Sequence, residues 1–396
     1  MTSPQKKRIL IVAGETSGDV YASTLIDVLQ DMGPYEFFAV GGQQTAKRKV
    51  HLLYNSTSWA AIGYIEAFKR APKLLFALRK LKRFLTEKRP DLLILVDYPG
   101  FNMRLTKWAK KLGIPTLFYF PPRKFAIHPE DVVDAAQNID LVAANFTFTH
   151  EVYQKAGANV EFVGHPLLDI AKPSMSREKA FETFGLDLKR PVIGLCPGSR
   201  KSELDILLPI MIQAGKILYE KHPELQFLVP IVASKTNEVY GIPKADLQRQ
   251  LDESGLPIKM IEGKIYDVMA TSDILLISSG TATLEASHIG TPMIIVYRVS
   301  LITELVARAF NKLPNFIGLP NIIVGRQAVP EIIQHDLSPE SLAKQALHLF
   351  ESKEAQAKQK ADLVEVISHL GKPGAHARVA AMAHKLLNQK YGCPPK

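Results

Sequence analysis

A carboxylate and a group of small hydroxyl residues each follow a short apolar run in this sequence. Asp97 comes directly after Leu92–Val96, and Ser278–Thr283 follows the run that begins at Asp273. In open α/β sheets, ligands bind at the carboxyl ends of parallel strands. A carboxylate at such a point can act as a general base, and a loop of small residues lets an anion approach the backbone N–H groups of the next helix. The two stretches therefore predict a site that combines acid–base chemistry with binding of a nucleotide-like anion.

The anion site is predicted within Asp273–Gly290, which reads DILLISSGTATLEASHIG. Its first five residues have the length and composition of a buried parallel strand. A helix is expected to begin near Leu284, and its N-terminus carries a partial positive charge. Glu285, in the first turn, can accept hydrogen bonds from a sugar diol beside the anion. An ordinary strand-to-helix turn capped by Ser or Thr is the competing interpretation.

The composition is that of a soluble globular protein with two domains of moderate size. The chain has 396 residues, of which 46% are hydrophobic. Its two cysteines, Cys196 and Cys393, have neither disulfide-framework nor zinc-ligand spacing. No signal-peptide core follows the N-terminal residues, and no apolar run reaches the ~18–20 residues of a membrane span. These features predict a cytoplasmic protein in a reducing compartment.

Short apolar runs alternate with helical patterns on both sides of Lys172–Ser176, which reads as an interdomain linker. This alternation predicts an α/β protein with two Rossmann-like, doubly wound domains that face each other across a cleft. The expected domains are residues 1–172 and 173–340. A polar, strand-free segment of helices follows at 341–396 and is expected to pack back on the first domain.

Six motifs resemble those of the lipid-A-disaccharide synthase family, in the family's order and at compatible spacing. They are VAGETSGD (Val12–Asp19), VDYPGFN (Val96–Asn102), VGHPLLD (Val163–Asp169), PGSRKSE (Pro197–Glu203), SGTATLE (Ser279–Glu285) and LPNIIVGR (Leu319–Arg326). The resemblance implies a glycosyltransferase with the two-Rossmann-domain (GT-B) fold. It implies transfer, with inversion, of an acylated glucosamine from a UDP-sugar to the 6-hydroxyl of an acylated glucosamine 1-phosphate.

The resemblance also implies where the substrates bind. UDP is expected on the second domain and the lipid acceptor on the first, with no metal and no other cofactor; the sequence contains no DxD pair. One segment departs from the family pattern: in Pro121–Asp131, Phe125 and Ile127 stand where tryptophans are expected, and Asp131 stands near an expected arginine. This departure leaves the identity of the acceptor open.

Asp97 is the predicted general base, with a loop cap as the competing role. The residues predicted to bind substrate are Glu15, Ser17, Arg200, Ser279, Gly280, Thr281, Thr283, Glu285, Asn321 and Arg326. Arg200 is expected to pair with the leaving diphosphate, because a guanidinium can bind it through two hydrogen bonds. A surface salt bridge to Glu203 is the alternative for Arg200. Helix capping is the alternative for Ser17, and a plain turn is the alternative for Asn321 and Arg326.

Positive charge is concentrated in Ile62–Arg89, which carries nine Lys or Arg against two Glu, a net +7 of the chain's +10. From Lys73 the pattern is helical, with one apolar face formed by Leu74, Leu78, Leu81 and Leu85. Away from that face lie the residues predicted to contact a membrane: Phe76, Arg79, Lys80, Lys82 and Arg83. A phenylalanine among basic residues fits an anionic membrane surface better than nucleic acid. The protein is therefore expected at the inner face of the cytoplasmic membrane; a merely solvated helix is the alternative, and a homodimer is left open.

Three other functions remain open from the sequence. A lipid glycosyltransferase with another acceptor would explain the altered Pro121–Asp131 segment. A UDP-sugar epimerase of the same fold would not need the basic helix. A homologue that binds a sugar nucleotide without turnover would keep the nucleotide motifs alone.

Overall fold

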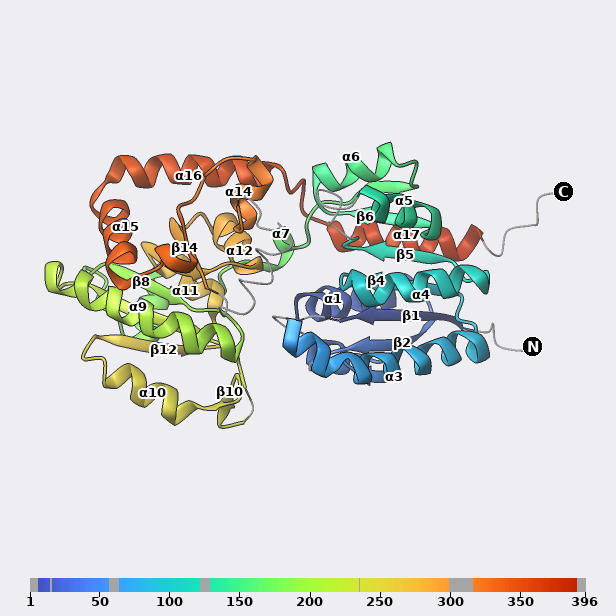
Figure 1. Cartoon of the computed structure of the whole chain (residues 1–396), viewed down its shortest axis with the longest axis horizontal. Coiled ribbons are helices and arrows are strands. Elements are labelled where there is room, and N and C mark those ends of the chain that lie inside the picture. The colour runs from blue at the N-terminus through green and yellow to red at the C-terminus, as the bar shows by residue number, and fades with distance from the viewer. Residues whose placement is uncertain are drawn as a thin grey trace. The chain divides into compact units, whose positions relative to one another are not determined.

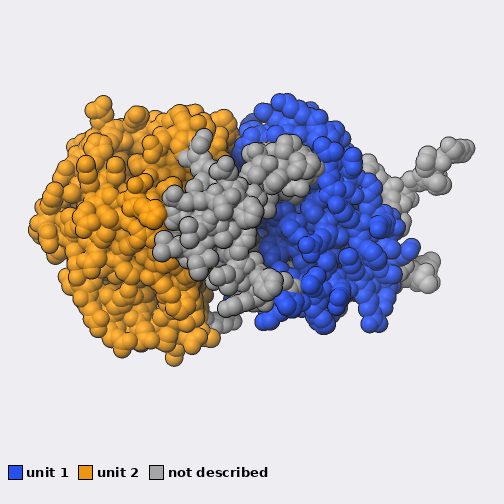
Figure 2. Space-filling model, viewed as in Figure 1, with its two compact units in different colours: residues 1–169, 370–396 blue, residues 170–369 orange. Residues whose placement is uncertain are grey.

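The computed structural model describes residues 6–14, 16–56, 64–121, 129–234, 236–298 and 316–389. The chain forms two compact units, which are coloured separately in Figure 2. Unit 1 comprises Met1–Asp169 and Leu370–Lys396, and unit 2 comprises Ile170–His369. The chain therefore passes between the units twice, first within the short helix α7 (Leu167–Ile170) and again after His369.

Unit 1 is built on a seven-stranded parallel sheet with the order β3-β2-β1-β4-β5-β6-β7 (Figure 1). The strands are β1 (Lys7–Ala13), β2 (Tyr35–Gly41), β3 (His51–Asn55), β4 (Leu92–Val96), β5 (Thr116–Tyr119), β6 (Leu141–Ala144) and β7 (Val160–Phe162). Central strands such as β4 are buried along their whole length, as expected where helices cover both faces of a parallel sheet.

Helices pack on both faces of this sheet. One face is covered by α3 (Tyr64–Lys88), α4 (Pro99–Lys111), α5 (Pro129–Asn138) and α6 (Thr147–Lys155), whose apolar residues share one core cluster with the strands. On the other side α1 (Thr16–Met32) packs against α17 (Ala375–Gln389), which also contacts β4. The short α2 (Gln43–Ala46) follows β2. The leucine face predicted for α3 is confirmed, because Leu78, Leu81 and Leu85 are at most 7% exposed.

Unit 2 is built on a six-stranded parallel sheet with the order β12-β9-β8-β13-β14-β15. The strands are β8 (Val192–Cys196), β9 (Gln226–Ile231), β12 (Ile258–Glu262), β13 (Ile274–Ser278), β14 (Met293–Tyr297) and β15 (Glu331–Ile333). A small antiparallel hairpin, β10 (Glu238–Val239) and β11 (Ile242–Pro243), follows β9.

Helices again pack on both faces of the sheet. One core cluster joins the strands to α9 (Lys201–Lys221), α10 (Lys244–Asp252) and α15 (Pro339–Glu351). The remaining helices contact one another: α8 (Arg177–Phe184), α11 (Ile265–Thr271), α12 (Thr281–Ile289), α14 (Leu319–Val324) and α16 (Lys353–Ser368). The 3-10 turn η2 (Gln334–Asp336) leads into α15. Two doubly wound α/β units are thus present, and the predicted fold class is confirmed.

The C-terminal helices divide differently from the prediction that 341–396 packs as a whole on the first domain. Helices α15 and α16 belong to unit 2, because apolar residues of α15 lie in its core and Gln359 of α16 hydrogen-bonds both backbone groups of Met293. Only α17 joins unit 1. There Asp169 accepts a hydrogen bond from the Gly374 N–H at 2.9 Å, and Arg378 donates to the Val163 carbonyl at 2.8 Å.

The predicted linker Lys172–Ser176 is part of unit 2. Ser174 donates from its backbone N–H and its hydroxyl to the carboxylate of Asp267, at 2.6 and 2.8 Å. Asp267 is 4% exposed, so these bonds hold the segment against α11. The boundary of unit 1 therefore lies at Asp169, just before this segment.

Candidate active site

In unit 2, strands β8 and β13 are neighbours, and the loops that follow them carry the residues predicted to bind the nucleotide. Cys196 pairs with Ile277 near the ends of the two strands. The loop after β8 leads through Arg200 into α9, and the loop after β13 leads through Ser279 and Gly280 into α12. Their backbones and the N-termini of two helices thus meet at the carboxyl edge of one sheet, where ligands bind in this class of fold.

The N-cap residue of α12 is Gly280, which has no side chain to cap the helix. The Ser279 hydroxyl donates to the Ile317 carbonyl at 2.9 Å, and the Thr283 hydroxyl donates to the Gly280 carbonyl at 2.7 Å. Those two hydroxyls therefore hold the loop itself, and the ligand contacts predicted for Ser279 and Thr283 stay a prediction. Gly280 is exposed and Thr281 is partly buried, and a Cβ at Gly280 would meet no atom within 4 Å.

Glu285 lies on α12 facing α11. The Tyr266 hydroxyl of α11 donates to its carboxylate at 3.2 Å. Burial raises the pKa of Glu285 from 4.5 to about 7, although the Tyr266 hydrogen bond acts in the opposite direction. Burial also raises the pKa of Tyr266 strongly, and the neighbouring Glu285 charge adds to this shift. The predicted diol-binding carboxylate is therefore poised to change protonation near neutral pH.

Arg200 immediately precedes α9 and pairs with Glu203 in its first turn, Nη1 to Oε1, at 2.8 Å. The other carboxylate oxygen of Glu203 accepts the Ser199 N–H at 3.0 Å. The Glu203 side chain is only 8% exposed, against 39% for Arg200. Gly198 has a φ of 120° and a Cβ there would lie 2.2 Å from a Glu203 oxygen, so this turn requires glycine. The salt bridge considered as the alternative from sequence is thus present, and it holds Arg200 at the sheet edge.

Asn321 and Arg326 lie in the segment that precedes β15, but Asn321 is buried within the unit whereas Arg326 is exposed. Asn321 is fully buried; its amide donates to the Val329 carbonyl and to Glu331, and its oxygen accepts the N–H groups of Ala328 and Val329. All four hydrogen-bonding positions of the side chain are thus used within the fold. Glu331 also accepts from the backbone N–H groups of residues 317 and 318, at 3.0 and 2.9 Å.

Arg326 points toward α16, where it pairs with Asp362 at 2.8 Å and also with Glu365. These two carboxylates raise the pKa of the Arg326 guanidinium through hydrogen bonds. The side chains of Asn321 and Arg326 are thus bound by Glu331 and by carboxylates of α16, and their role in substrate binding stays a prediction. Their segment contacts the loop after β13 through Ser279, which bonds Ile317.

In unit 1, Asp97 follows β4, and the loop that begins at Gly14 follows the neighbouring strand β1. Asp97 has a φ of 53°, which is rare for a residue other than glycine.

Ser17 is partly buried in the first turn of α1, whereas Glu15 lies outside the described residues. Asp19 accepts the backbone N–H groups of residues 42, 44 and 45 at 2.7–3.0 Å, so this acidic residue holds α2 in place. The altered segment Pro121–Asp131 lies largely outside the described part of the chain.

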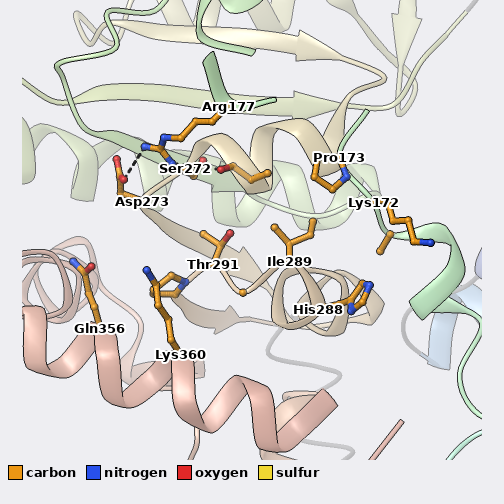
Figure 3. Close-up of a pocket in the computed structure, with 14 residues that line it drawn as sticks. Lys172, Pro173, Arg177, Ser272, Asp273, His288, Ile289, Thr291, Gln356 and Lys360 are labelled. Atoms are coloured by element: carbon orange, nitrogen blue, oxygen red, sulfur yellow. Dashed lines mark hydrogen bonds and ion pairs between the residues drawn. The ribbon is translucent and has the colours of Figure 1, made fainter. Parts of the chain in front are cut away.

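A cavity of about 390 Å³ lies in unit 2 at the opposite end of the sheet, where β13 and β14 begin (Figure 3). Lys172, Arg177, Asp273, Thr291 and Lys360 are among its lining residues. None of the predicted substrate-binding residues lines it. Within the described ranges, no group of three or more His, Cys, Asp or Glu side chains is arranged to hold a metal ion.

A profile of the family described as lipid-A-disaccharide synthetase matches residues 9–386 of this chain. The chain is 37% identical to lipid-A-disaccharide synthase of Geobacter metallireducens over 391 residues, 98% of this chain and 100% of that protein. The chain belongs to the lipid-A-disaccharide synthase family. The resemblance noted from six motifs is confirmed, and membership makes the protein a hexosyltransferase of lipid A synthesis.

Solved structures of other enzymes share the fold of this family member at low sequence identity. The crystal structure of Acinetobacter baumannii MurG has a TM-score of 0.57 and 16% identity, covering 96% of this chain and 99% of that one. UDP-GlcNAc 2-epimerase from Neisseria meningitidis bound to UDP-GlcNAc has a TM-score of 0.60 and 13% identity, covering 96% and 100%. The predicted GT-B fold is thereby confirmed.

Sequence reasoning gave no role to three residues that shape these sites. Tyr266 positions Glu285, Glu331 organises the segment before β15, and Asn102 of α4 bonds the carbonyl of Asp97. Asn102 stood inside a quoted motif and was a detectable candidate. Tyr266 and Glu331 act through contacts between distant segments, for which the sequence carries no local signal.

Proposed function

We propose that this protein transfers an acylated glucosamine from a UDP-sugar to the 6-hydroxyl of an acylated glucosamine 1-phosphate, with inversion and release of UDP. The observation that carries the proposal is the placement of Asp97. It stands at the carboxyl end of a central strand of unit 1, and a direct inverting displacement needs one base and no covalent intermediate. Unit 1 is accordingly the acceptor domain and unit 2 the donor domain.

The donor half of the proposal is supported by the chemistry of the unit 2 sheet edge. A helix N-terminus that begins at a glycine favours a diphosphate, and Arg200, in the loop after the neighbouring strand β8, supplies a full positive charge for the leaving UDP. Glu285, when ionised, accepts hydrogen bonds from a diol. The epimerase of similar fold was solved with a UDP-sugar, which agrees with a UDP-sugar donor for this chain.

In the proposed mechanism the 6-hydroxyl oxygen of the acceptor attacks the anomeric carbon of the donor sugar. The carboxylate of Asp97 accepts the proton of that hydroxyl during the attack. The bond from the anomeric carbon to the UDP oxygen breaks, and UDP leaves with both electrons. A single displacement inverts the anomeric configuration. The guanidinium of Arg200 compensates the charge that develops on the diphosphate.

The test is mass spectrometry of the products formed from UDP-diacylglucosamine and diacylglucosamine 1-phosphate. A disaccharide phosphate together with UDP is the expected result. An epimerised UDP-sugar would instead indicate the epimerase, and UDP binding without turnover would indicate a non-catalytic homologue. If the donor is consumed only when another lipid acceptor is supplied, the protein is a related glycosyltransferase with a different acceptor.

We also propose that α3 holds the enzyme on the inner face of the cytoplasmic membrane. Leu75 and Phe76 are 46% and 64% exposed, and the exposed side chains of Arg79, Lys80 and Arg83 follow on the same helix. Apolar side chains within a basic surface suit an anionic bilayer, whose lipids supply both acyl interior and negative charge. Within the described ranges, no helix combines the length and apolar character needed to cross a membrane.

A further inference from the structure

The backbone at the proposed base is held in a conformation that few residues adopt. Asp97 has a φ of 53°, and Tyr98 after it has a φ of 51° and a ψ of 55°. Two consecutive residues other than glycine thus lie in the left-handed region, which Cβ sterics disfavour. Such a conformation persists only where neighbouring groups enforce it.

The side chain of Asn102, near the start of α4, contacts this backbone. Its side chain is fully buried, and Nδ2 lies 2.6 Å from the Asp97 carbonyl oxygen. The same nitrogen lies 3.4 and 3.5 Å from the carbonyl oxygens of Val12 and Val96. Three carbonyl oxygens around one atom require that atom to be the amide nitrogen, because an oxygen there would be repelled by all three.

The ring of Tyr98 lies directly over Gly14, at the end of β1. A Cβ at Gly14 would come within 2.3 Å of the ring and 2.7 Å of the Tyr98 Cβ. Only glycine therefore fits beneath Tyr98 in this arrangement. The loops after β1 and β4 are interlocked through this contact and through the Asn102 amide.

We propose that Asn102 is a positioning residue that fixes the direction of the Asp97 carboxylate. The Asp97 N–H donates to the Tyr119 carbonyl at 3.0 Å, and its carbonyl accepts from Asn102, so both backbone polar groups are bound. The two peptide planes that flank the Asp97 Cα are thereby each held, and the direction of the Cα–Cβ bond with them. This inference rests on the proposed role of Asp97 as the base. Loss of the Asn102 amide lets the peptide rotate and moves the carboxylate away from the acceptor hydroxyl.

The test compares Asn102→Ala in wild type and in Asp97→Asn, using UDP-diacylglucosamine and diacylglucosamine 1-phosphate as substrates. In wild type the substitution should lower kcat at least about tenfold, with the affinity for UDP unchanged. In the Asp97→Asn background it should change the residual rate less than about twofold, since it acts only through Asp97. Asn102→Asp, which keeps the shape but removes the donor, should be as slow as the alanine variant.

Thr106→Val is the matched control. Thr106 is equally buried on the same helix, and its hydroxyl donates to the Asn102 carbonyl at 3.0 Å. It should keep kcat within about twofold of wild type. If Asn102→Ala does not fold, Gly14→Ala replaces it, since the added Cβ should displace Tyr98 and lower kcat in the same way.

The outcomes separate the proposed role of Asp97 as the base from the proposed role of Asn102 as a positioning residue. Full activity of Asp97→Asn would overturn the proposed base and the positioning role with it. An inactive Asp97→Asn beside a fully active Asn102→Ala would overturn the positioning role alone. Equal rate losses from Asn102→Ala in both backgrounds would also overturn it, because they would show an effect independent of Asp97.

Discussion

Arg200 donates from Nη1 to Glu203 at 2.8 Å, at the carboxyl edge of the unit 2 sheet. The pair is asymmetric: the Glu203 side chain is nearly buried, whereas the arginine is 39% exposed. The carboxylate, which also accepts the Ser199 N–H, therefore serves as a fixed anchor and leaves the other guanidinium nitrogens for an incoming anion.

Arg200→Ala is expected to weaken UDP binding by about 2–5 kcal/mol, the range for losing one partner of a desolvated charge pair. Isothermal titration calorimetry measures this directly. Lys201→Ala is the control, because Lys201 pairs with exposed Asp205 and should leave UDP affinity unchanged. If Arg200→Ala lowers folding stability but leaves the affinity for UDP unchanged, Arg200 has a structural role as the salt-bridge partner of Glu203 and does not bind UDP.

Asp97→Asn is expected to lower turnover at least about a hundredfold, because a positioned general base contributes that much or more. UDP affinity should be unchanged, since the proposed donor site lies in unit 2. Asp91→Asn is the control at the opposite end of β4, where Asp91 accepts the Arg8 N–H at 2.7 Å. An Asp97→Asn rate within about threefold of wild type would make Asp97 structural.

The ionisation of Glu285 should lower the free energy of unfolding as the pH rises from 4.5 to 7. Its pKa is raised to about 7 in the folded protein, so the unfolded chain ionises first and unfolding releases a proton over this interval. Glu285→Gln should therefore be more stable than wild type at pH 8, by at most about 3 kcal/mol. The difference should disappear below pH 4.5, where both states are protonated.

Urea unfolding at pH 4, 6 and 8 measures this dependence, and Glu262→Gln supplies a control of opposite sign. Hydrogen bonds from Lys244 and the Ser234 N–H lower the pKa of Glu262, so its contribution to stability is present at neutral pH and lost in acid. Glu262→Gln should therefore lower stability at pH 8. A Glu285→Gln variant less stable than wild type at pH 8 would contradict the raised pKa.

Buried periodic segments could be predicted from sequence, and half-exposed ones could not. Strand β4 coincides with the apolar run Leu92–Val96, and β13 lies one residue later than the expected Asp273–Ile277, because both are uninterrupted apolar runs in a parallel sheet. Strand β3 gives no such signal, since both of its ends are exposed and its sequence, HLLYN, does not alternate. The helix expected from Lys73 begins at Tyr64 instead, with Pro72 inside it.

The candidate sites were predicted as regions more accurately than as individual side-chain contacts. Motif and strand position located Asp97 and the loop after β13, but not the left-handed backbone at 97–98, since neither residue is glycine. Asn321 and Arg326 lie in the right segment with their side chains bound elsewhere, to Glu331 and to carboxylates of α16. No pattern in the sequence marks these partners, so only the folded structure reveals them.

The basic residues of α3 do not all lie on one surface. Lys82 lies over the Trp108 ring of α4, 4.8 Å from its centroid, and Lys80 donates to the Leu53 carbonyl at 3.2 Å. Arg79 is exposed, and Arg83 pairs with Glu87 at 2.6 Å in an exposed i,i+4 bridge. We therefore expect Arg79 and Arg83 to contribute more to membrane attraction than Lys82, whose side chain packs on its own unit.

Replacing Arg79, Lys80, Lys82 and Arg83 together with Ser should release the protein from anionic vesicles at low salt. Each basic residue near an anionic leaflet contributes about 1 kcal/mol, and the substitutions touch no residue of the α3 core face. Raising salt should release wild type as well, because the Debye length falls from about 10 Å at 0.1 M to about 3 Å at 1 M. Phe76→Ser should remove the binding that persists at high salt.

Vesicle sedimentation measures these effects, with vesicles of neutral lipid as a second condition. The matched control replaces four exposed lysines of unit 2, Lys344, Lys353, Lys358 and Lys360, with Ser, which removes the same charge from α15 and α16. If net charge alone drives binding, both fourfold variants should be released equally. Release confined to the α3 variant would assign the membrane contact to this helix, where Leu75 and Phe76 are exposed beside the cations. Wild-type sedimentation of the α3 variant at low salt would place the membrane contact elsewhere.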